Sequence, residues 1–369
     1  MTELLIWLLR LLAGLLVLVT LLPLLRVGSK YVRCWDFPRL QIAVVCGGVA
    51  GAILAVNVLE RSRPDLWILA CLLVACGLWQ LGHVLRYSRF WPEAVRPSQA
   101  GDLRLLVSNL DFRNHRHVEA SNVLEELDPD VLLLIEIDDV WREALQDVRR
   151  HYPDRLEHVR GEGLGLALWS KWPIEDGAVE HLVSEKRASL HATLVSPDGL
   201  RVPFVGLHPP PPGLERKNGE RYDSRIRDAE LVKVADRVAA DPEKPWIVAG
   251  DFNDVAWSHT TRLFERISGL LDPRVGRRLL NTYHARRPLL RYPLDHVFLS
   301  PSYRVRDIQR IRLPGSDHFA VLIELTFADP KPAQPEHDAE DRREAKEAVE
   351  EGHEEARENG EAARPAHSP

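Results

Sequence analysis

The chain of 369 residues has few thiols, and none beyond its first hundred residues. Its four cysteines are Cys34, Cys46, Cys71 and Cys76, and none of them stands at a metal-ligand spacing from a histidine. The sequence therefore indicates neither a zinc site nor a disulfide framework. Residues 101–330 contain no cysteine, so this part fits an oxidising or a reducing compartment equally well.

An excess of positive charge is also missing from most of the chain, whose formal net charge is −6. Residues 101–330 carry 32 Lys+Arg against 37 Asp+Glu, whereas the first hundred residues carry 10 against 5. Avid, sequence-independent binding of nucleic acid requires a basic surface that contacts many phosphates. The composition therefore argues against a stable nucleic-acid partner.

Long hydrophobic runs are present, and all of them lie in the first 85 residues. Residues 4–25, 40–59 and 66–85 are each long enough to cross a bilayer as a helix. A cleaved signal peptide would explain the first run but not the other two. We therefore predict a membrane region over residues 1–85 with three transmembrane helices, followed by a linker over residues 86–101.

The distribution of basic residues bears on the orientation of these helices. With three spans, the loop after the first helix lies on the same side as the remainder of the chain. That side is the more basic, which by the positive-inside rule places the later residues in the cytoplasm. Its basic residues near the membrane are Arg26, Lys30, Arg33, Arg39, Arg86, Arg89, Arg96 and Arg104, against Arg61 and Arg63 on the opposite side.

Residues 102–328 read as one mixed domain, and residues 329–369 as a tail. Many short strands mixed with helices favour an α/β sandwich over a simple βαβ repeat. The tail is charged and almost without large apolar side chains, so we expect it to be disordered. The expected strands are 103–109, 130–137, 165–169, 189–195, 202–208, 246–250, 294–299, 305–311 and 320–327, and the expected helices are 117–127, 140–149, 220–239 and 257–267.

The most informative stretch runs from Trp246 to Asn253. Residues 247–249 are apolar and indicate a buried strand, and Gly250 permits a sharp turn or a close approach. Asp251 and Asn253 are two residues apart, so they face the same way in extended backbone. On its own this pattern is equally consistent with a strand followed by an ordinary turn.

Other predicted strand ends carry polar side chains as well. Each of them alone is more often structural, as a helix cap or a hydrogen-bonded core histidine. Together they favour a functional polar site at the rim of a sheet. These residues are Asn109, Glu136, His208, Asp295, Asp317 and His318.

The order of these residues matches a known pattern. Residues 103–327 resemble the endonuclease/exonuclease/phosphatase superfamily, which includes DNase I-like nucleases, inositol polyphosphate 5-phosphatases and neutral sphingomyelinases. The resemblance implies a four-layer α/β sandwich, with two packed mixed sheets flanked by helices and the active site at the sheet rims. Residues 163–174 are similar to the strand and turn that follow the family's metal-binding glutamate.

The resemblance also implies a metal site. Glu136 would be the principal ligand of Mg²⁺, since a hard cation prefers carboxylate oxygen and few protein ligands. Asn109 and Asp317 would complete or support its coordination shell. Mn²⁺ is a possible alternative to Mg²⁺.

The remaining residues would carry the catalytic roles. Asp251 would orient and activate the attacking water, and Asn253 would hold the phosphoryl group or that water. His318, paired with Asp295, would contact the phosphate as imidazolium or act as acid and base. His208 would donate to the phosphoryl oxygens or protonate the leaving group.

One position departs from the family pattern. In DNase I-like nucleases an acid orients the histidine at the position of His208, and here the corresponding residue is Gly163, with Glu162 beside it. Either Glu162 substitutes for that acid or no residue does. His296 is an additional imidazole that we expect to be structural.

The substrate is inferred from the context of the domain. A membrane region and an acidic domain favour a lipid-linked phosphate ester, phosphodiester or pyrophosphate as substrate. The alternatives are a membrane-tethered nuclease and a binding module without catalytic activity. The three spans also resemble those of bacterial plasma-membrane members, including the teicoplanin-resistance protein of vancomycin-resistance clusters. Those members hold the catalytic domain outside the cytoplasm, which conflicts with the charge count. The side of the membrane on which the domain lies is therefore not assigned.

Overall fold

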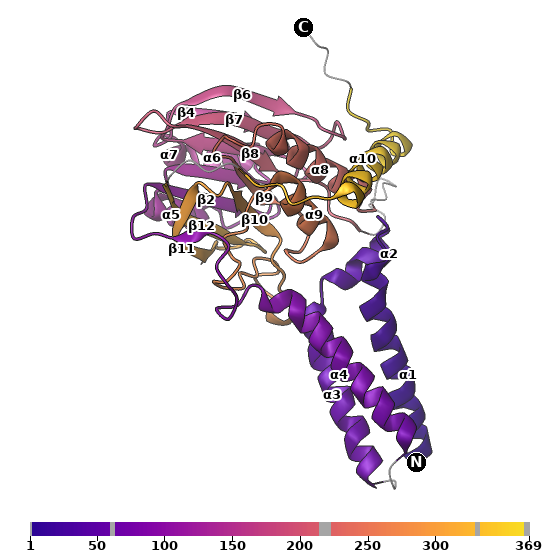
Figure 1. Ribbon diagram of the computed structural model, residues 1–369. Helices are drawn as coiled ribbons and strands as arrows, with labels where there is room; N and C mark the ends of the chain where they lie inside the picture. The colour runs from indigo at the N-terminus through magenta and orange to yellow at the C-terminus, as the bar shows by residue number, and fades with distance from the viewer. Residues whose placement is uncertain (1, 60–62, 214–222, 329–332, 365–369) are drawn as a thin grey trace.

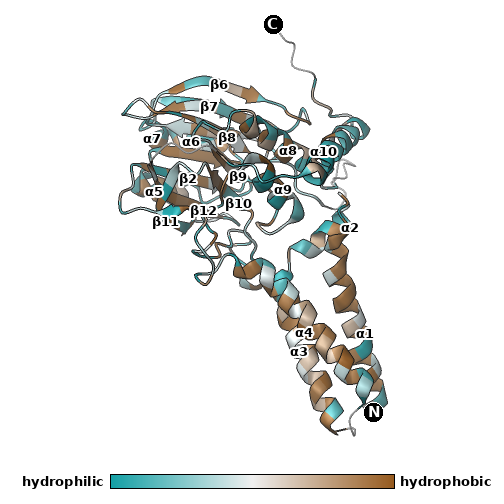
Figure 2. Ribbon diagram, viewed as in Figure 1, coloured by the Kyte–Doolittle hydropathy of each residue, from teal (hydrophilic) through white to brown (hydrophobic). Residues whose placement is uncertain are grey.

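The computed structural model describes residues 2–59, 63–213, 223–328 and 333–364, and it consists of a helical stalk below an α/β domain (Figure 1). The stalk contains α1 (Thr2–Leu21), α3 (Arg39–Leu59) and α4 (Pro64–Leu85). Three helices are long and apolar enough to cross a membrane, over Glu3–Leu24, Arg39–Leu59 and Pro64–Leu85. These spans agree with the predicted ones and suggest membrane anchoring; Figure 2 shows the stalk as mainly hydrophobic.

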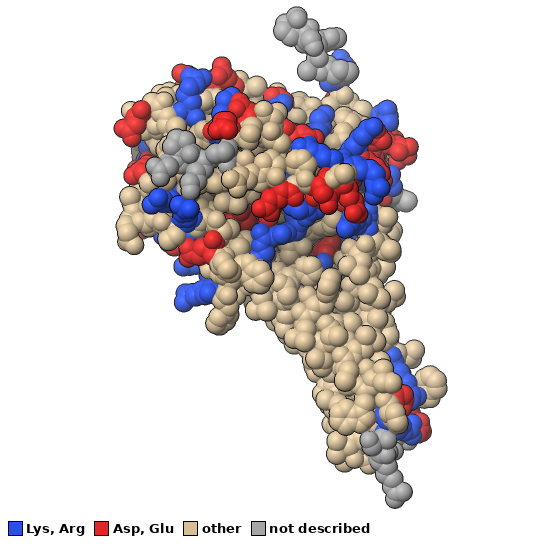
Figure 3. Space-filling view, in the orientation of Figure 1, with Lys and Arg blue, Asp and Glu red and all other residues tan. Residues whose placement is uncertain are grey.

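The outer surface of the stalk is unsuited to water. Large side chains such as Trp7, Ile68 and Leu78 are more than half exposed, and Figure 3 shows no charge along the middle of the stalk. Lipid rather than water suits an apolar surface of this extent. The charge of Arg10 lies at the distal end of the stalk, where the guanidinium pairs with Asp65 at the start of α4.

The segment between α1 and α3 folds against the domain. It contains η1 (Leu22–Leu24), α2 (Lys30–Arg33) and η2 (Cys34–Asp36), and we call residues 22–38 the α1–α3 connector. The Trp257 indole donates to the Asp36 carbonyl oxygen at 2.7 Å. The Phe37 ring meets the ring of Tyr292 edge-on, with 5.5 Å between centroids. The connector is therefore part of the domain surface.

The segment predicted as a linker, residues 86–101, is also packed on the domain. Tyr87 and Val95 are buried, and the Tyr87 hydroxyl donates to the Ala256 carbonyl oxygen at 2.7 Å. A short strand, β1 (Arg96–Pro97), pairs with β11 (Tyr303–Arg312). These contacts hold the domain directly above the stalk, so residues 86–101 are part of the domain surface and not a free linker.

Two mixed sheets form the centre of the domain. The seven-stranded sheet has the order β1-β11-β12-β2-β3-β5-β4, and the five-stranded sheet has the order β10-β9-β8-β7-β6. Strand β2 is parallel to β3, and β8 is parallel to β9. The other strands are β2 (Leu103–Asn109), β3 (Val131–Ile135), β4 (Asp154–His158), β5 (Leu166–Ser170), β6 (Ile174–Glu180), β7 (Ser189–Val195), β8 (Arg201–Leu207), β9 (Ile247–Asp251), β10 (Asp295–Leu299) and β12 (Phe319–Phe327).

The sheets pack face to face with helices on both outer sides. Apolar residues of both sheets form the central cluster, including Leu133, Phe204 and Ile323. Helices α5 (His117–Leu127), α6 (Asp139–Ala144) and α7 (Gln146–Arg149) cover the seven-stranded sheet. Helices α8 (Arg225–Ala239) and α9 (His259–Ser268) cover the five-stranded sheet. This arrangement confirms the predicted four-layer sandwich. Residues 220–222 of the expected helix 220–239 lie outside the described residues.

The expectation of a disordered tail is wrong for residues 339–358, which form α10 (Ala339–Glu358) against α8 and α9. Its buried residues are three small ones, Ala345, Gly352 and Ala356, and two acids, Asp341 and Glu355, which a search for large apolar side chains overlooks. Asp338 caps the first turn, and Asp341 accepts a forked pair of hydrogen bonds from Arg266. Residues 329–332 and 365–369 lie outside the described residues.

The contact of α10 with α8 can be tested by Gly352→Leu. A Cβ at this glycine would lie 2.3 Å from the Ala229 Cβ, so the larger side chain forces the helices apart at about 1–3 kcal/mol. We expect faster proteolysis between residues 333 and 363 than in the unmodified protein. Glu354→Leu on the exposed side of α10 serves as control, and equal cleavage of both variants would contradict this packing.

Candidate active site

The topology brings the predicted residues of the first sheet to one edge. Asn109 is the last residue of β2, and Glu136 follows β3 directly. Because β2 and β3 are parallel, the two side chains leave the sheet side by side. Strand β12 runs antiparallel to β2, so His318, which precedes β12, lies at the same edge.

The second sheet repeats this arrangement at the facing edge. His208 follows β8, and Asp251 ends β9, which is parallel to β8. Strand β10 begins with Asp295 and runs antiparallel to β9, so that Asp295 is the register partner of Asp251. The rims of both sheets therefore supply one site.

A cavity of about 450 Å³ opens between the two rims. Most of the predicted site residues line it, and Asn109 and Asp295 lie behind them as hydrogen-bond partners. The lining residues are Phe37, Phe112, Arg113, Glu136, Glu162, Gly163, Arg187, His208, Pro211, Pro212, Asp251, Asn253, Tyr283, Leu294, Asp317 and His318.

Asn109 joins the two carboxylates of the site. Its side-chain nitrogen donates to Glu136 Oε1 at 3.2 Å and to Asp251 Oδ2 at 3.1 Å. His208 Nε2 lies 4.0 Å from Glu136 Oε1. The second oxygen of Glu136 accepts from the Phe112 backbone amide at 3.1 Å. This network holds Glu136 and Asp251 on the same side of the cavity.

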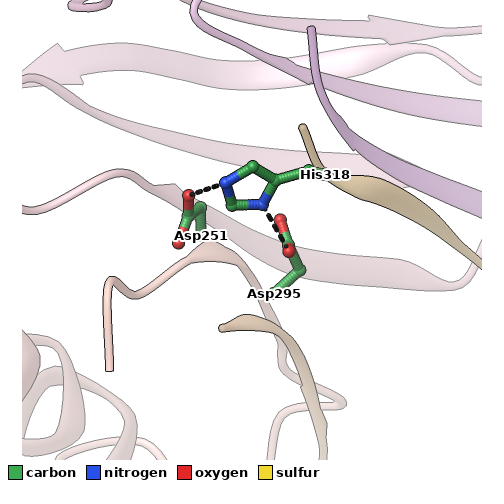
Figure 4. Close-up of side chains that lie close together, drawn as sticks. All are labelled: Asp251, Asp295 and His318. Atoms are coloured by element: carbon green, nitrogen blue, oxygen red, sulfur yellow. Dashed lines mark hydrogen bonds and ion pairs between the residues drawn. The ribbon is translucent and has the colours of Figure 1, made fainter. Parts of the chain in front are cut away.

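His318 stands between two carboxylates (Figure 4). Its Nδ1 lies 2.8 Å from Asp295 Oδ2, and its Nε2 lies 3.6 Å from Asp251 Oδ2. Burial by itself would lower the pKa of His318, but Asp295 and Asp251 outweigh it and raise that pKa. The geometry thus favours an imidazolium whose ring is oriented by Asp295.

Burial raises the pKa of a carboxyl group, whereas it lowers the pKa of a histidine. It raises the pKa of Asp251, although His318 opposes the effect, and it raises the pKa of Glu136 against hydrogen bonds from Phe112 and Asn109. Two buried carboxylates at one cavity are stabilised in their charged form by a nearby cation. Perturbed groups of this kind are typical of functional sites.

The backbone at the site adopts conformations that are rare elsewhere. Gly250 has φ 151°, and a Cβ there would lie 2.0 Å from the Leu207 carbonyl oxygen. Glu136 and Asn253 have φ of 63° and 51°, in the left-handed region that non-glycine residues seldom occupy. The glycine that the sequence singled out is therefore required for close approach of β9 to β8.

Asn253 and the proline run form one wall of the cavity. The Asn253 side-chain nitrogen donates to the Pro209 carbonyl oxygen at 3.0 Å, and Pro211 and Pro212 line the cavity. The Asn253 backbone amide donates to Asp251 Oδ1 at 2.9 Å. One side-chain donor of Asn253 is thus already engaged, so its predicted contact to a phosphoryl group would use the remaining amide atoms.

Glu162 and Gly163 both lie at the cavity, beside Glu136. A Cβ on Gly163 would approach the Glu136 carboxyl carbon to 3.3 Å, and Gly163 has φ 74°. Glycine therefore leaves room for the Glu136 carboxylate, which is also the acid 4.0 Å from His208 Nε2. This offers a physical reason for the departure from the family pattern at this position.

His296 lies outside the cavity, as the sequence suggested. It is fully buried and stacks on Phe252 with 4.7 Å between ring centroids. Its Nδ1 accepts from Arg274 at 2.7 Å, and its Nε2 donates to the Asp254 carbonyl oxygen at 2.9 Å. Burial lowers the pKa of His296 to about 3, which suits a neutral structural residue.

Two positions at the rim fit a divalent cation. One lies at Glu136, with Asp317 lining the same cavity. Asn109 supports this position as a hydrogen-bond donor to Glu136, since its Oδ1 accepts from the Asp111 backbone amide at 3.0 Å. The other lies among Asp251, Asp295 and His318, whose ligand atoms are within 4.8 Å of one another. At the second position the hydrogen bond between His318 and Asp295 occupies two of these atoms. The oxygen preference of Mg²⁺ therefore favours the first position.

No local sequence pattern marks Arg187, Phe112 or Tyr283, which complete the cavity. Arg187 is buried and lines it. Arg113 also lines the cavity, 3.9 Å from Asp317. Phe112 and Tyr283 add aromatic surface. These residues come from irregular segments between strands, where spacing carries no pattern.

Comparisons with known proteins agree with this fold. The model of the Endonuclease/Exonuclease/phosphatase family matches residues 106–318. An endonuclease/exonuclease/phosphatase from Beutenbergia cavernae is 19% identical, with a TM-score of 0.51 over 63% of this chain and 73% of that chain. A humanized D. rerio TDP2 is 17% identical, with a TM-score of 0.48 over 61% of this chain and 98% of that one. Curated proteins gave no match.

The family match covers more than half of the chain, so the chain belongs to the endonuclease/exonuclease/phosphatase family. It is a DNase I-like member of a superfamily of hydrolases that act on phosphoester bonds. Such enzymes are typically dependent on a divalent metal, and the acids and histidine at this rim offer a possible site for one.

Asp295→Asn tests the pairing of His318. Loss of this carboxylate removes a cause of the raised pKa of His318, so the imidazolium deprotonates at a lower pH. We expect the alkaline limb of the kcat/KM profile against a soluble chromogenic phosphodiester to move to lower pH, with a loss of about 100-fold or more near neutral pH. An unshifted limb would contradict the pairing. Asp139→Asn, at an exposed position of α6, is the control.

Proposed function

We propose that the protein is a membrane-anchored, Mg²⁺-dependent phosphoesterase whose substrate is a lipid-linked phosphate ester, phosphodiester or pyrophosphate. One observation carries the proposal: Phe37, from the connector between the first two candidate membrane spans, lines the cavity that holds Glu136 and Asp251. A catalytic cavity walled in part by the membrane anchor suits a substrate that arrives from the bilayer.

The acidic residues of the rim would bind the metal ion and activate the attacking water. Glu136 would hold the metal ion with Asp317, supported by the hydrogen bond that Asn109 donates to Glu136. The ion would supply neutralisation of charge on the phosphoryl oxygens. Asp251 accepts a proton from the attacking water, since burial has raised its pKa toward the range of a general base. The metal site and these roles are predictions, and Mn²⁺ is the alternative ion.

The two histidines would act on the phosphoryl group and the leaving oxygen. His318, held as imidazolium by Asp295, donates to a phosphoryl oxygen, where charge develops. His208, whose Nε2 lies 4.0 Å from Glu136 Oε1, would donate to a phosphoryl oxygen or to the leaving group. Arg187 and Arg113 supply further positive charge at the cavity.

A lipid-linked substrate is favoured over nucleic acid by charge and position. The middle of the chain has a net negative charge, and Phe37 of the α1–α3 connector lines the cavity. Because the three spans resemble those of bacterial plasma-membrane members of the family, we propose a plasma-membrane location. The proposal assigns no side of the membrane to the domain.

Turnover of a lipid panel by the full-length protein in nanodiscs tests this function. We expect release of phosphate or a phosphorylated head group from at least one lipid phosphate or polyprenyl pyrophosphate. The activity should fall about 10³-fold with EDTA, with Glu136→Ala and with Asp251→Ala, and return when Mg²⁺ is restored to the unmodified protein. Asp139→Ala is the matched control at an exposed acid.

A different result would redirect the assignment. Metal-dependent nicking of supercoiled plasmid with no turnover of any lipid would overturn the lipid-linked substrate and support the nuclease alternative. Calorimetry that shows no Mg²⁺ binding would count against the metal site.

A further inference from the structure

We propose that an apolar groove between α3 and the segment 279–292 holds the hydrocarbon chain of the substrate lipid while its phosphate lies at Glu136 and Asp251. This inference rests on the proposed function for the identity of the head group. It adds a second binding site, which selects substrates by their chain and which none of the predicted catalytic residues forms.

The groove has a volume of about 400 Å³ and a largely apolar lining. One side is formed by the first two turns of α3, and the other by the domain. The residues that carry the argument are Phe37, Leu40, Val44, Trp257, Leu289 and Tyr292.

The groove opens at the level where the stalk meets the domain. Val44 is 68% exposed and Leu289 is 81% exposed, so both offer apolar surface to whatever surrounds the stalk. Leu289 lies in η3 (Pro288–Leu290), and its carbonyl oxygen accepts from the Gln41 side chain at 2.8 Å. This bond ties η3 to α3, whose span begins at Arg39. The groove mouth therefore faces the membrane boundary.

Phe37 separates the groove from the catalytic cavity. It lines both of them, and its ring packs edge-on against Tyr292 on the groove side. Tyr283, which lines the catalytic cavity, forms a backbone bridge with Tyr292. A lipid can thus place its phosphate in the polar cavity and its chain in the groove, past one aromatic ring.

A hydrocarbon chain fits this groove better than a peptide does. The apolar side chains of the groove continue onto the exposed residues Val44 and Val45 of α3, where the surrounding phase is lipid if the stalk spans a membrane. A bound peptide would need partners for its backbone polar groups, and the lining offers only Gln41, Asn281 and Arg291. Of these, Gln41 already donates to the Leu289 carbonyl oxygen and Arg291 to the Ala285 carbonyl oxygen. A chain from the bilayer needs contact with apolar side chains only.

Photo-crosslinking in nanodiscs tests the groove independently of turnover. The probe is a phosphatidic acid with a diazirine in its acyl chain, bound to the full-length protein. We expect crosslinks concentrated on residues 40–45 and 288–292, reduced about fivefold or more by Val44→Trp, which fills the groove. The control is Val58→Trp, which is equally lipid-facing at the far end of α3. Crosslinks spread evenly over α1, α3 and α4, or equal yields from both variants, would overturn the proposal.

Chain-length dependence separates failure of this inference from failure of the proposed function. We expect Val44→Trp to lower the ratio of long-chain to short-chain lipid turnover at least about fivefold, with the ratio unchanged in Val58→Trp. Lipid turnover with the same ratio in both variants would leave the function standing and exclude the groove. Focused crosslinks without turnover of any lipid would support the groove and exclude the function.

Discussion

The site depends on the burial of two carboxylates that face each other across neighbouring strands. Asp251 and Asp295 are register partners in β9 and β10, and like charges in that relation destabilise a sheet. His318 compensates, because its two nitrogens face one carboxylate each. The imidazolium is therefore both a structural requirement of this rim and the cationic group that a phosphate would meet.

The sheet topology explains why the polar side chains collect at one edge. Parallel pairs β2–β3 and β8–β9 end there, while the antiparallel neighbours β12 and β10 begin there. The residues of these strands that face the opposite sheet are apolar and form the central core. A buried polar side chain needs partners, which the strand ends at the rim supply, and packing the two sheets face to face brings their rims together.

A buried ionic network joins the α1–α3 connector to the loop that follows Asp251. Arg227 pairs with Asp228 at 2.9 Å and with Asp254 at 3.3 Å, and it donates to the Asn253 carbonyl oxygen at 2.9 Å. Arg33 of the α1–α3 connector lies 4.0 Å from Asp228. Buried charges of this kind demand fixed geometry, since an unpaired member is costly. The position of the connector is thus tied to the loop that follows Asp251.

The sequence by itself determined the spans, the sandwich and most of the rim, because long apolar runs and polar strand ends are local signals. Asn109, Glu136, His208, Asp251 and His318 each follow or precede an apolar run, and the structure brings them together. The tertiary structure alone decided three matters. It placed Arg187 and Phe37 at the cavity, it folded α10 through small residues and ion pairs, and it packed the α1–α3 connector and residues 86–101 on the domain. These features depend on contacts between segments far apart in the chain, which leave no periodic pattern in the sequence.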